Sequence, residues 1–391
     1  MKIESVDFFY LSMPSVLDIG DGSQDALLVR IRAGGLEGWG ECEASPLTSI
    51  ASYVCPMSHS ACKPLKYSVE GKALNTVRDI RRISNSIHAN SFDLLQADHT
   101  LSGIDIALWD LLGKKMGQPV YKLLGYQKAF PKIPYASQLF GGNPEETFKK
   151  AKSARMDGFN AIKFGWGVFG RGNIENDIAH LEAAREGAGH DSLLMIDAGT
   201  VWENHFNAAK KRLVALKKIR AFWLEEPFGN LSVGAYKNLS ASSPKISLAG
   251  GEGCNNYTQA KLMIEHAGLS YIQIDAGRIG GITAAMQIAD LAAKSGISYV
   301  NHTFTSHLAL SASLQPFVGK EKDILCEYPI EPKQLAKDIT QTKIVPDKNG
   351  YLHIPENPGL GISIDKNTIK KYLVELEIKV SGQKIYYTPD I

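Results

Sequence analysis

The runs Leu193-Leu-Met-Ile-Asp197, Phe222-Trp-Leu-Glu-Glu-Pro227 and Ile246-Ser-Leu-Ala-Gly-Gly-Glu252 share one pattern, an apolar segment followed at its end by an acidic residue. The acids Asp197, Glu225 and Glu252 follow one another at intervals of 28 and 27 residues. Such an interval is close to the length of one strand–helix unit. Because parallel barrel strands bring their C-terminal ends to one mouth, the three carboxylates are expected to converge there.

Short apolar runs of this kind recur from about residue 133 to about 330, and the stretches between most of them have helical character. The runs end near Ser137, Lys163, Asp197, Glu225, Glu252, Asp275, His302 and Glu327. Eight strand ends that point in one direction predict an α/β fold, a closed TIM-like (β/α) barrel. An open doubly wound sheet also alternates strands and helices and is the alternative.

The first part of the chain does not alternate. Residues 1–40 are predicted to form strands, and residues 75–125 to form helices, an order that indicates an α+β unit. The tail from about residue 345 is rich in turn residues and is expected to return to this unit. The sequence therefore predicts a capping domain of residues 1–125, completed by residues 345–391, and a barrel domain of residues 126–344.

Composition limits the function. Of 391 residues, 44% are hydrophobic and 21% are charged, as in ordinary globular proteins. The formal charge of +2 gives no electrostatic reason to expect a nucleic-acid or membrane partner. The five cysteines form no Cys-x-x-Cys pair, and the sequence shows neither a signal-peptide core nor a membrane-spanning run. A cytoplasmic protein with reduced thiols is expected.

Three converging carboxylates repel one another unless a cation neutralises them, and oxygen ligands of this kind suit Mg²⁺. Each acid alone would be read as a surface residue. Their matched spacing favours a metal site on Asp197, Glu225 and Glu252. Glu226 neighbours Glu225, and the sequence leaves open which of the two binds.

Four further residues at strand ends are candidates for chemistry. Asp275 and His302 lie on adjacent strands, where a carboxylate would orient the imidazole as a general base. Lys163 is expected to bind a substrate carboxylate or to act as a base. Glu327, if protonated, would donate a hydrogen bond to an enolate oxygen. His307 is interpreted as structural.

Several motifs in order resemble those of one family. They are Ser102-Gly-Ile-Asp-Ile-Ala-Leu-Trp-Asp-Leu-Leu-Gly-Lys114, Leu224-Glu-Glu-Pro227, Gly250-Gly-Glu252, Ile274-Asp-Ala-Gly-Arg-Ile-Gly-Gly281, Val300-Asn-His302 and Pro358-Gly-Leu-Gly-Ile362. Together they resemble the enolase superfamily, in its mandelate racemase/muconate lactonizing enzyme branch. The resemblance implies an α+β cap over a (β/α)₇β barrel and Mg²⁺ on the three acids. It also implies an Asp275–His302 dyad, an acid at Glu327, and self-association, from dimer to octamer.

Two positions depart from the family pattern. Racemases of this group carry Lys-x-Lys on the second barrel strand, where this chain has Lys163-Phe-Gly165. A glycine therefore stands where the second base would be, and the next residue, Trp166, cannot take a proton. The other departure is Gly199, where relatives often carry asparagine. Racemisation needs a base on each face, so the first departure argues against it.

The sequence therefore predicts an Mg²⁺-dependent dehydratase of a sugar acid, an aldonate or an aldarate. His302 would remove the proton next to the carboxylate, and the product would be a 2-keto-3-deoxy acid. A cycloisomerase, an epimerase or racemase, and a catalytically silent binding barrel are the alternatives. The polar, glycine-rich loop 18–25 reads as a lid, and Asp21 and Glu43 are expected to bind substrate hydroxyls.

Overall fold

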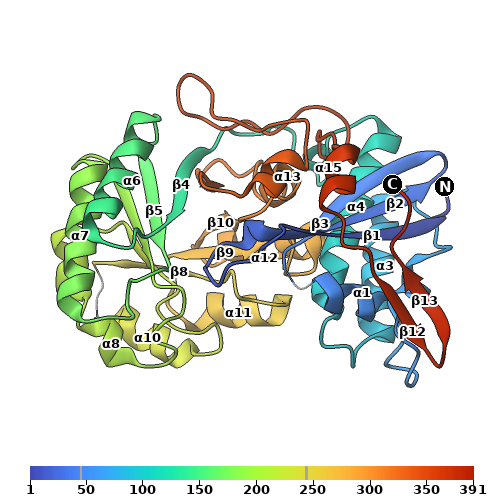
Figure 1. The fold of residues 1–391 in the computed structure, drawn as a ribbon, viewed down its shortest axis with the longest axis horizontal. Helices are drawn as coiled ribbons and strands as arrows, with labels where there is room; N and C mark the ends of the chain where they lie inside the picture. Colours follow the sequence, from blue (N-terminus) through green and yellow to red (C-terminus); the bar gives the residue numbers. More distant parts are fainter. Residues whose placement is uncertain (45, 243–244) are drawn as a thin grey trace.

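The computed structural model describes residues 1–44, 46–242 and 245–391. The chain forms a barrel with its surrounding helices, on the left in Figure 1, and a cap that holds both termini, on the right. None of the helices in the described part of the chain is long and apolar enough to cross a bilayer.

The barrel consists of eight strands that pair in parallel in the order β10-β9-β8-β7-β6-β5-β4-β11. They are β4 (Ile133–Leu139), β5 (Ala161–Gly165), β6 (Leu193–Asp197), β7 (Trp223–Glu225), β8 (Ser247–Gly250), β9 (Tyr271–Asp275), β10 (Ser298–His302) and β11 (Leu325–Pro329). The two ends of this order are joined by a side chain, because the Glu327 N–H donates to Asn301 Oδ1 at 2.9 Å. The predicted closed barrel is confirmed.

The barrel helices are α6 (Pro144–Met156), α7 (Ile174–Ala188), α8 (Phe206–Lys210), α9 (Leu213–Lys218), α10 (Val233–Ser242), α11 (Tyr257–His266), α12 (Gly281–Lys294), α13 (His307–Leu314) and the short α14 (Gln334–Asp338). Four of the described barrel helices, α6, α7, α11 and α13, begin at a side-chain cap. Asn143 accepts from the Glu146 N–H and is followed by Pro144, and Asn173 accepts from the Asn176 N–H.

A Gly-x-Gly-x-x-Gly spacing, which nucleotide-binding open sheets use between a strand and a helix, does occur after β5, at residues 165–170. Here it serves packing instead. Gly170 has a φ of 78°, and a Cβ there would lie 2.5 Å from Val201 Cγ1. Helix α7 begins only at Ile174, so no helix N-terminus follows this glycine loop directly.

The barrel interior has an apolar layer below a polar one. Tyr135, Ala161, Met195, Trp223, Val300 and Leu325 pack together inside the barrel. Side chains alternate along a strand with a period of two, so the residue two positions later faces the interior one layer higher. Those later residues are Ser137, Lys163, Asp197, Glu225, His302 and Glu327. The strand period therefore places the predicted site above a packed floor.

The cap is an antiparallel sheet of β1 (Ser5–Ser12), β2 (Asp25–Ala33) and β3 (Leu36–Cys42), covered by helices. The helices are η1 (Gly22–Gln24), α1 (Pro46–Val54), α2 (Lys66–Val69), α3 (Val77–Asn90), α4 (Ala97–Met116) and α5 (Val120–Leu123). Helix α4 approaches β3 so closely that a Cβ at Gly40 would lie 2.1 Å from the Gly103 carbonyl oxygen. Only glycine fits this crossing.

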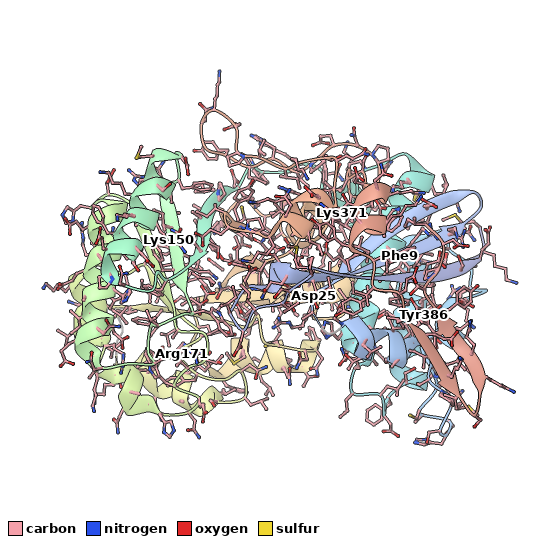
Figure 2. The ribbon with its side chains drawn as sticks, in the orientation of Figure 1. Phe9, Asp25, Lys150, Arg171, Lys371 and Tyr386 are labelled. Carbon is pink, nitrogen blue, oxygen red and sulfur yellow. The ribbon has the colours of Figure 1, made fainter. Side chains whose placement is uncertain are left out.

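The C-terminal tail lies against the cap through α15 (Lys366–Tyr372), β12 (Glu377–Val380) and β13 (Gln383–Tyr387). Val374 N–H donates to the Tyr10 carbonyl at 2.8 Å, and Tyr386 Oη donates to the Phe8 carbonyl at 2.7 Å. Figure 2 labels Tyr386 on the same side of the molecule as Phe9 of β1, away from Lys150 and Arg171 of the barrel. Earlier in the tail, Leu352 pairs with Lys132 just ahead of β4.

Glu41 of β3 links the cap to the loop after β10, because its Oε2 accepts a hydrogen bond from Ser306 Oγ. Its Oε1 is buried and has no hydrogen-bond partner. Burial raises the pKa of Glu41 to about 7, and the nearby Asp275 carboxylate adds to the effect. The folded protein therefore keeps a proton here that an unfolded chain, with a pKa near 4.3, releases earlier.

Glu41 should consequently make stability fall with rising pH. Its contribution is complete below about pH 4 and is lost as pH rises to about 7, by up to about 1.4 kcal/mol per pH unit. We expect Glu41→Gln to remove this part of the slope in urea unfolding between pH 5 and 8. Glu37→Gln, on the same strand, should leave it in place. Parallel pH curves for wild type and Glu41→Gln would contradict the prediction.

Candidate metal and active site

The three predicted metal ligands come together at the barrel mouth. Asp197 ends β6, Glu225 ends β7, and Glu252 lies two residues beyond the end of β8. One carboxylate oxygen from each lies within 4.8 Å of the others, and all three residues are buried. Glu226 turns away with a φ of 37°, and its Oε1 accepts from the backbone of Gly251 at 3.4 Å. Glu225, and not Glu226, therefore lies together with Asp197 and Glu252.

The surroundings of these carboxylates fit a hard divalent cation. The Gly199 N–H donates to Asp197 Oδ1 at 2.7 Å, and Trp223 Nε1 donates to Glu225 Oε2 at 2.8 Å. These bonds hold the outer oxygens, as supports of metal ligands do. Glu252 Oε2 is buried without a hydrogen-bond partner. An orphaned carboxylate oxygen beside two other carboxylates is a position that a cation would satisfy.

Electrostatics point the same way. Burial, together with repulsion from Glu225, raises the pKa of Asp197 well above its usual value. Burial raises the pKa of Glu225 to about 7, although Lys163 opposes the shift. Ionised Asp197 and Glu225 are thus costly in the protein alone, and a bound divalent cation would offset that cost.

Lys163 lies among the carboxylates. Its Nζ is 2.5 Å from Glu225 Oε1, 2.7 Å from Glu327 Oε1 and 3.9 Å from Asp197 Oδ2. Burial alone would lower its pKa, but Glu225 and Glu327 outweigh burial and raise the pKa well above its usual value. Of the two roles expected for Lys163, this environment favours a fixed positive charge over a base.

The predicted dyad is formed. His302 Nδ1 lies 2.7 Å from Asp275 Oδ2, and the Gly277 N–H fixes the other Asp275 oxygen at 2.6 Å. His302 Nε2 lies 3.4 Å from Glu252 Oε2. Burial opposes the charged imidazole, but Glu252 and then Glu327 raise the pKa of His302 well above its usual value. The ring is therefore oriented by Asp275, with Nε2 on the side of the metal ligands.

Glu327 is placed differently from the expected neutral acid. It accepts hydrogen bonds from Ser137 Oγ at 2.8 Å and from the Thr303 N–H at 2.9 Å, besides its contact with Lys163. Burial would raise its pKa, but Lys163 and His302 lower it below its usual value. With three donors aimed at it, Glu327 is a carboxylate that holds Lys163 in place. No motif in the sequence indicates Ser137 or Thr303 in this role.

A cavity of about 270 Å³ lies between the lid and the barrel mouth, lined by Lys163, Asp197, Glu252 and His302 among others. Asp21 of the lid also lines it, but the Asp21 carboxylate accepts from the Ser23 N–H at 2.9 Å and lies 3.5 Å from Lys333 Nζ. Figure 2 labels Asp25, the last lid residue, near the centre of the molecule, where cap and barrel meet. The loop 18–25 thus lies at the barrel mouth, with Asp21 held by its own contacts.

Glu43 lines the same cavity and is paired with Arg278, a residue that the sequence reasoning missed. Arg278 Nε donates to Glu43 Oε2 at 3.0 Å, and Nη2 donates to the same oxygen at 2.5 Å. Arg278 Nη1 donates to the Glu252 carbonyl at 3.0 Å. The feature of the sequence that could have indicated Arg278 is its position three residues after Asp275, within the motif Ile274–Gly281.

Trp166 closes one side of the cavity in a left-handed conformation, with a φ of 58°. A Cβ on Gly20 of the lid would lie 2.7 Å from the indole Cδ2, and one on Gly199 would lie 2.9 Å from the same atom. Both glycines therefore lie directly against the indole ring. The departure at Gly199 thus makes room for Trp166.

Gly165 packs against the Asp197 carboxylate. A Cβ at this position would lie 2.5 Å from Asp197 Oδ2 and 3.0 Å from Asp197 Cβ. A side chain at position 165, lysine included, would therefore require the Asp197 carboxylate to shift from the position it has here.

We expect Gly165→Ala to weaken binding of a divalent cation about tenfold or more, because disturbed supports of metal ligands typically cost 10- to 100-fold. Titration with Mg²⁺ by calorimetry measures this. Gly234→Ala, in α10 with nothing within 4 Å of its added carbon, is the matched control. Equal affinities for the two variants would contradict the steric account.

Comparison with known proteins agrees with this geometry. Residues 146–368 match the model of the enolase C-terminal domain-like family, and residues 11–125 match the mandelate racemase/muconate lactonizing enzyme N-terminal domain. The crystal structure of a predicted mandelate racemase from Rhodobacter sphaeroides is similar with a TM-score of 0.95. It is 52% identical in sequence, and the match covers 100% of each chain.

Characterised relatives carry out different reactions. D-galactarolactone cycloisomerase of Agrobacterium fabrum is 30% identical over 70% of this chain and 73% of its own. N-succinyl-L-Arg/Lys racemase of Bacillus cereus is 28% identical over 71% and 72%, and L-talarate/galactarate dehydratase of Salmonella typhimurium 31% over 60% and 55%. The chain is a member of the enolase superfamily, in the mandelate racemase/muconate lactonizing enzyme family.

Proposed function

We propose that the protein is an Mg²⁺-dependent dehydratase of a sugar acid, an aldonate or an aldarate. The observation that carries this proposal is the single base at the site. Among the described residues of the cavity, His302 is oriented by Asp275, and β5 carries Gly165, packed against Asp197, where racemases of this group have their second lysine. An elimination that uses one face needs one base, whereas racemisation needs two.

Asp197, Glu225 and Glu252 would hold the Mg²⁺. When bound, the ion would supply positive charge beside the substrate carboxylate and so make the neighbouring C–H bond more acidic. Lys163 contributes a second, permanent charge, since Glu225 and Glu327 fix its ammonium group at 2.5 and 2.7 Å. These charges make the proton at C2 acidic enough for a histidine to remove it.

The chain's residues then carry the proton. His302 Nε2 takes the proton from C2 of the acid and leaves an enediolate, which can regain a proton from solvent. The enediolate electrons then form the C2=C3 bond as the C3–O bond breaks. The leaving hydroxide accepts the proton from His302 and departs as water. The enol becomes a 2-keto-3-deoxy acid by tautomerisation. One sugar acid thus gives one keto acid and one water, and His302 ends unchanged.

Cycloisomerisation is the second candidate, because a relative with 30% identity is a cycloisomerase. It would use the same proton removal but expel a ring oxygen of a lactone, so that no water leaves. His302 would serve both reactions. The two differ in the mass of the product, which equals that of the substrate in a cycloisomerisation.

The test is incubation of the purified protein and Mg²⁺ with a library of aldonic and aldaric acids and their lactones, followed by mass spectrometry. A keto acid lighter than its substrate by one water supports dehydration. A keto acid of unchanged mass from a lactone would replace dehydration by cycloisomerisation. A C2 epimer without a keto acid would contradict both.

A further inference from the structure

The ion pair between Glu43 and Arg278 forms part of the cavity wall and has no role in the chemistry proposed above. Glu43 comes from the cap, just after β3, and Arg278 from the loop after β9. Both lie in the same cavity as Asp197, Glu252 and His302. A substrate held at the metal ligands therefore extends its hydroxyl-bearing chain within reach of this pair.

The pair leaves bonding capacity on both partners. Arg278 uses three of its five N–H groups, two on Glu43 Oε2 and one on the Glu252 carbonyl. Among the described residues, none hydrogen-bonds Glu43 Oε1. A hydroxyl group can donate to Glu43 Oε1 and accept from a remaining Arg278 N–H at once. A carboxylate can only accept, and it would face the Glu43 charge.

The cavity offers a second carboxylate no other cation. Its charged lining residues are the acids Asp21, Glu43, Asp197 and Glu252 and the bases Lys163, Arg278 and His302. Lys163 is paired with Glu225 and Glu327, Arg278 with Glu43, and His302 with Asp275. Within the described part of the chain, each base of the lining already faces a carboxylate, so a second substrate carboxylate would find no unpaired cation there.

We propose that Glu43 and Arg278 bind substrate hydroxyls as a pair and select sugar acids with one carboxylate over those with two. This inference rests on the proposed function and narrows its substrate to aldonates, or to lactones that keep one free carboxylate. Glu43 acts as the discriminating charge, and Arg278 holds it in position.

The experiment compares acids that differ at one end only, D-galactonate with D-galactarate and D-gluconate with D-glucarate. Binding is measured by calorimetry with Mg²⁺ present, and turnover by keto-acid formation. Wild type should bind the preferred aldonate at least about tenfold more tightly than its aldarate, since one repulsive contact of about 1.4 kcal/mol gives that factor. Glu43→Gln removes the charge and frees Arg278, and should reverse the preference towards the aldarate.

Two controls separate selection from folding. Glu43→Asp keeps the charge and should keep the preference, whereas Glu37→Gln breaks an ion pair with Lys366 elsewhere in the cap and should change nothing. Equal or tighter binding of aldarates by wild type, an unchanged ratio in Glu43→Gln, or no binding of either class would overturn the inference. Keto-acid formation without a preference for aldonates would overturn this inference and leave the proposed dehydratase function intact. A preference for aldonates in binding, with no keto acid formed, would contradict the dehydratase function and leave the binding inference intact.

Discussion

Replacing His302 by asparagine is expected to lower kcat for keto-acid formation about a thousandfold, within the range lost with a general base. Asparagine can still donate to Asp275 Oδ2, which His302 Nδ1 now contacts at 2.7 Å, but it cannot take a proton from C2. The variant should also stop exchange of the substrate's α-proton with D₂O. Proton NMR follows both losses in one sample.

His307→Asn is the matched control, because His307 lies five residues along the same segment and accepts from the Ile344 N–H at 3.2 Å. It should retain nearly full activity. Mg²⁺ binding should be similar in all three proteins, since neither histidine is a proposed ligand. If His302→Asn kept wild-type exchange and turnover, another group would be the base, and the one-base mechanism would be wrong.

The second large effect is expected from Asp197→Asn. Relative to wild type, this variant should be more stable to heat without metal and less stable with Mg²⁺. Burial and Glu225 hold the pKa of Asp197 well above its usual value, so the charged form destabilises the metal-free fold. A raised pKa gives stability that is present at low pH and lost as pH rises. At pH 8 with a chelator, the variant should therefore unfold at a higher temperature than wild type, by about 2–4 °C for each kcal/mol relieved.

With Mg²⁺ the order should reverse. Wild type gains about 2.7 kcal/mol when the free ion is at 100 times its Kd, whereas the variant lacks one of three carboxylates and gains little. Thermal unfolding across an Mg²⁺ series measures both signs, and turnover should be lost in the variant. A variant that is less stable than wild type in chelator, or that gains equally from Mg²⁺, would contradict the metal assignment.

Much of the site could be predicted from the sequence, because residues spaced by one strand–helix unit lie at the same end of neighbouring barrel strands. Asp197, Glu225 and Glu252 recur at the length of one strand–helix unit, so they had to meet at one mouth. Asp275 and His302 follow the same rule on neighbouring strands, and the structure joins them at 2.7 Å.

The rest depends on contacts that one strand or loop cannot reveal. Which of Glu225 and Glu226 joins Asp197 and Glu252 depends on the end of β7, where the chain turns to a φ of 37° at Glu226. The ionised state of Glu327 depends on Lys163 from a distant strand and on the Thr303 N–H. The place of Arg278 in the cavity wall depends on the cap, which brings Glu43 beside it.

Gly165 shows where sequence and structure complement each other. The sequence identified it as a missing base, an argument against racemisation. The structure adds a steric reason, because a Cβ would lie 2.5 Å from Asp197 Oδ2. A base at this position would therefore require the Asp197 carboxylate to shift.

The single-base elimination is tested most directly by a reaction of the preferred sugar acid in D₂O with Mg²⁺, stopped at partial conversion and examined by proton NMR. We expect a 2-keto-3-deoxy acid that carries deuterium at C3, and remaining substrate with its original configuration at C2. Accumulation of the C2 epimer, with no keto acid, would show that a second base acts opposite His302 and would contradict a single-base elimination.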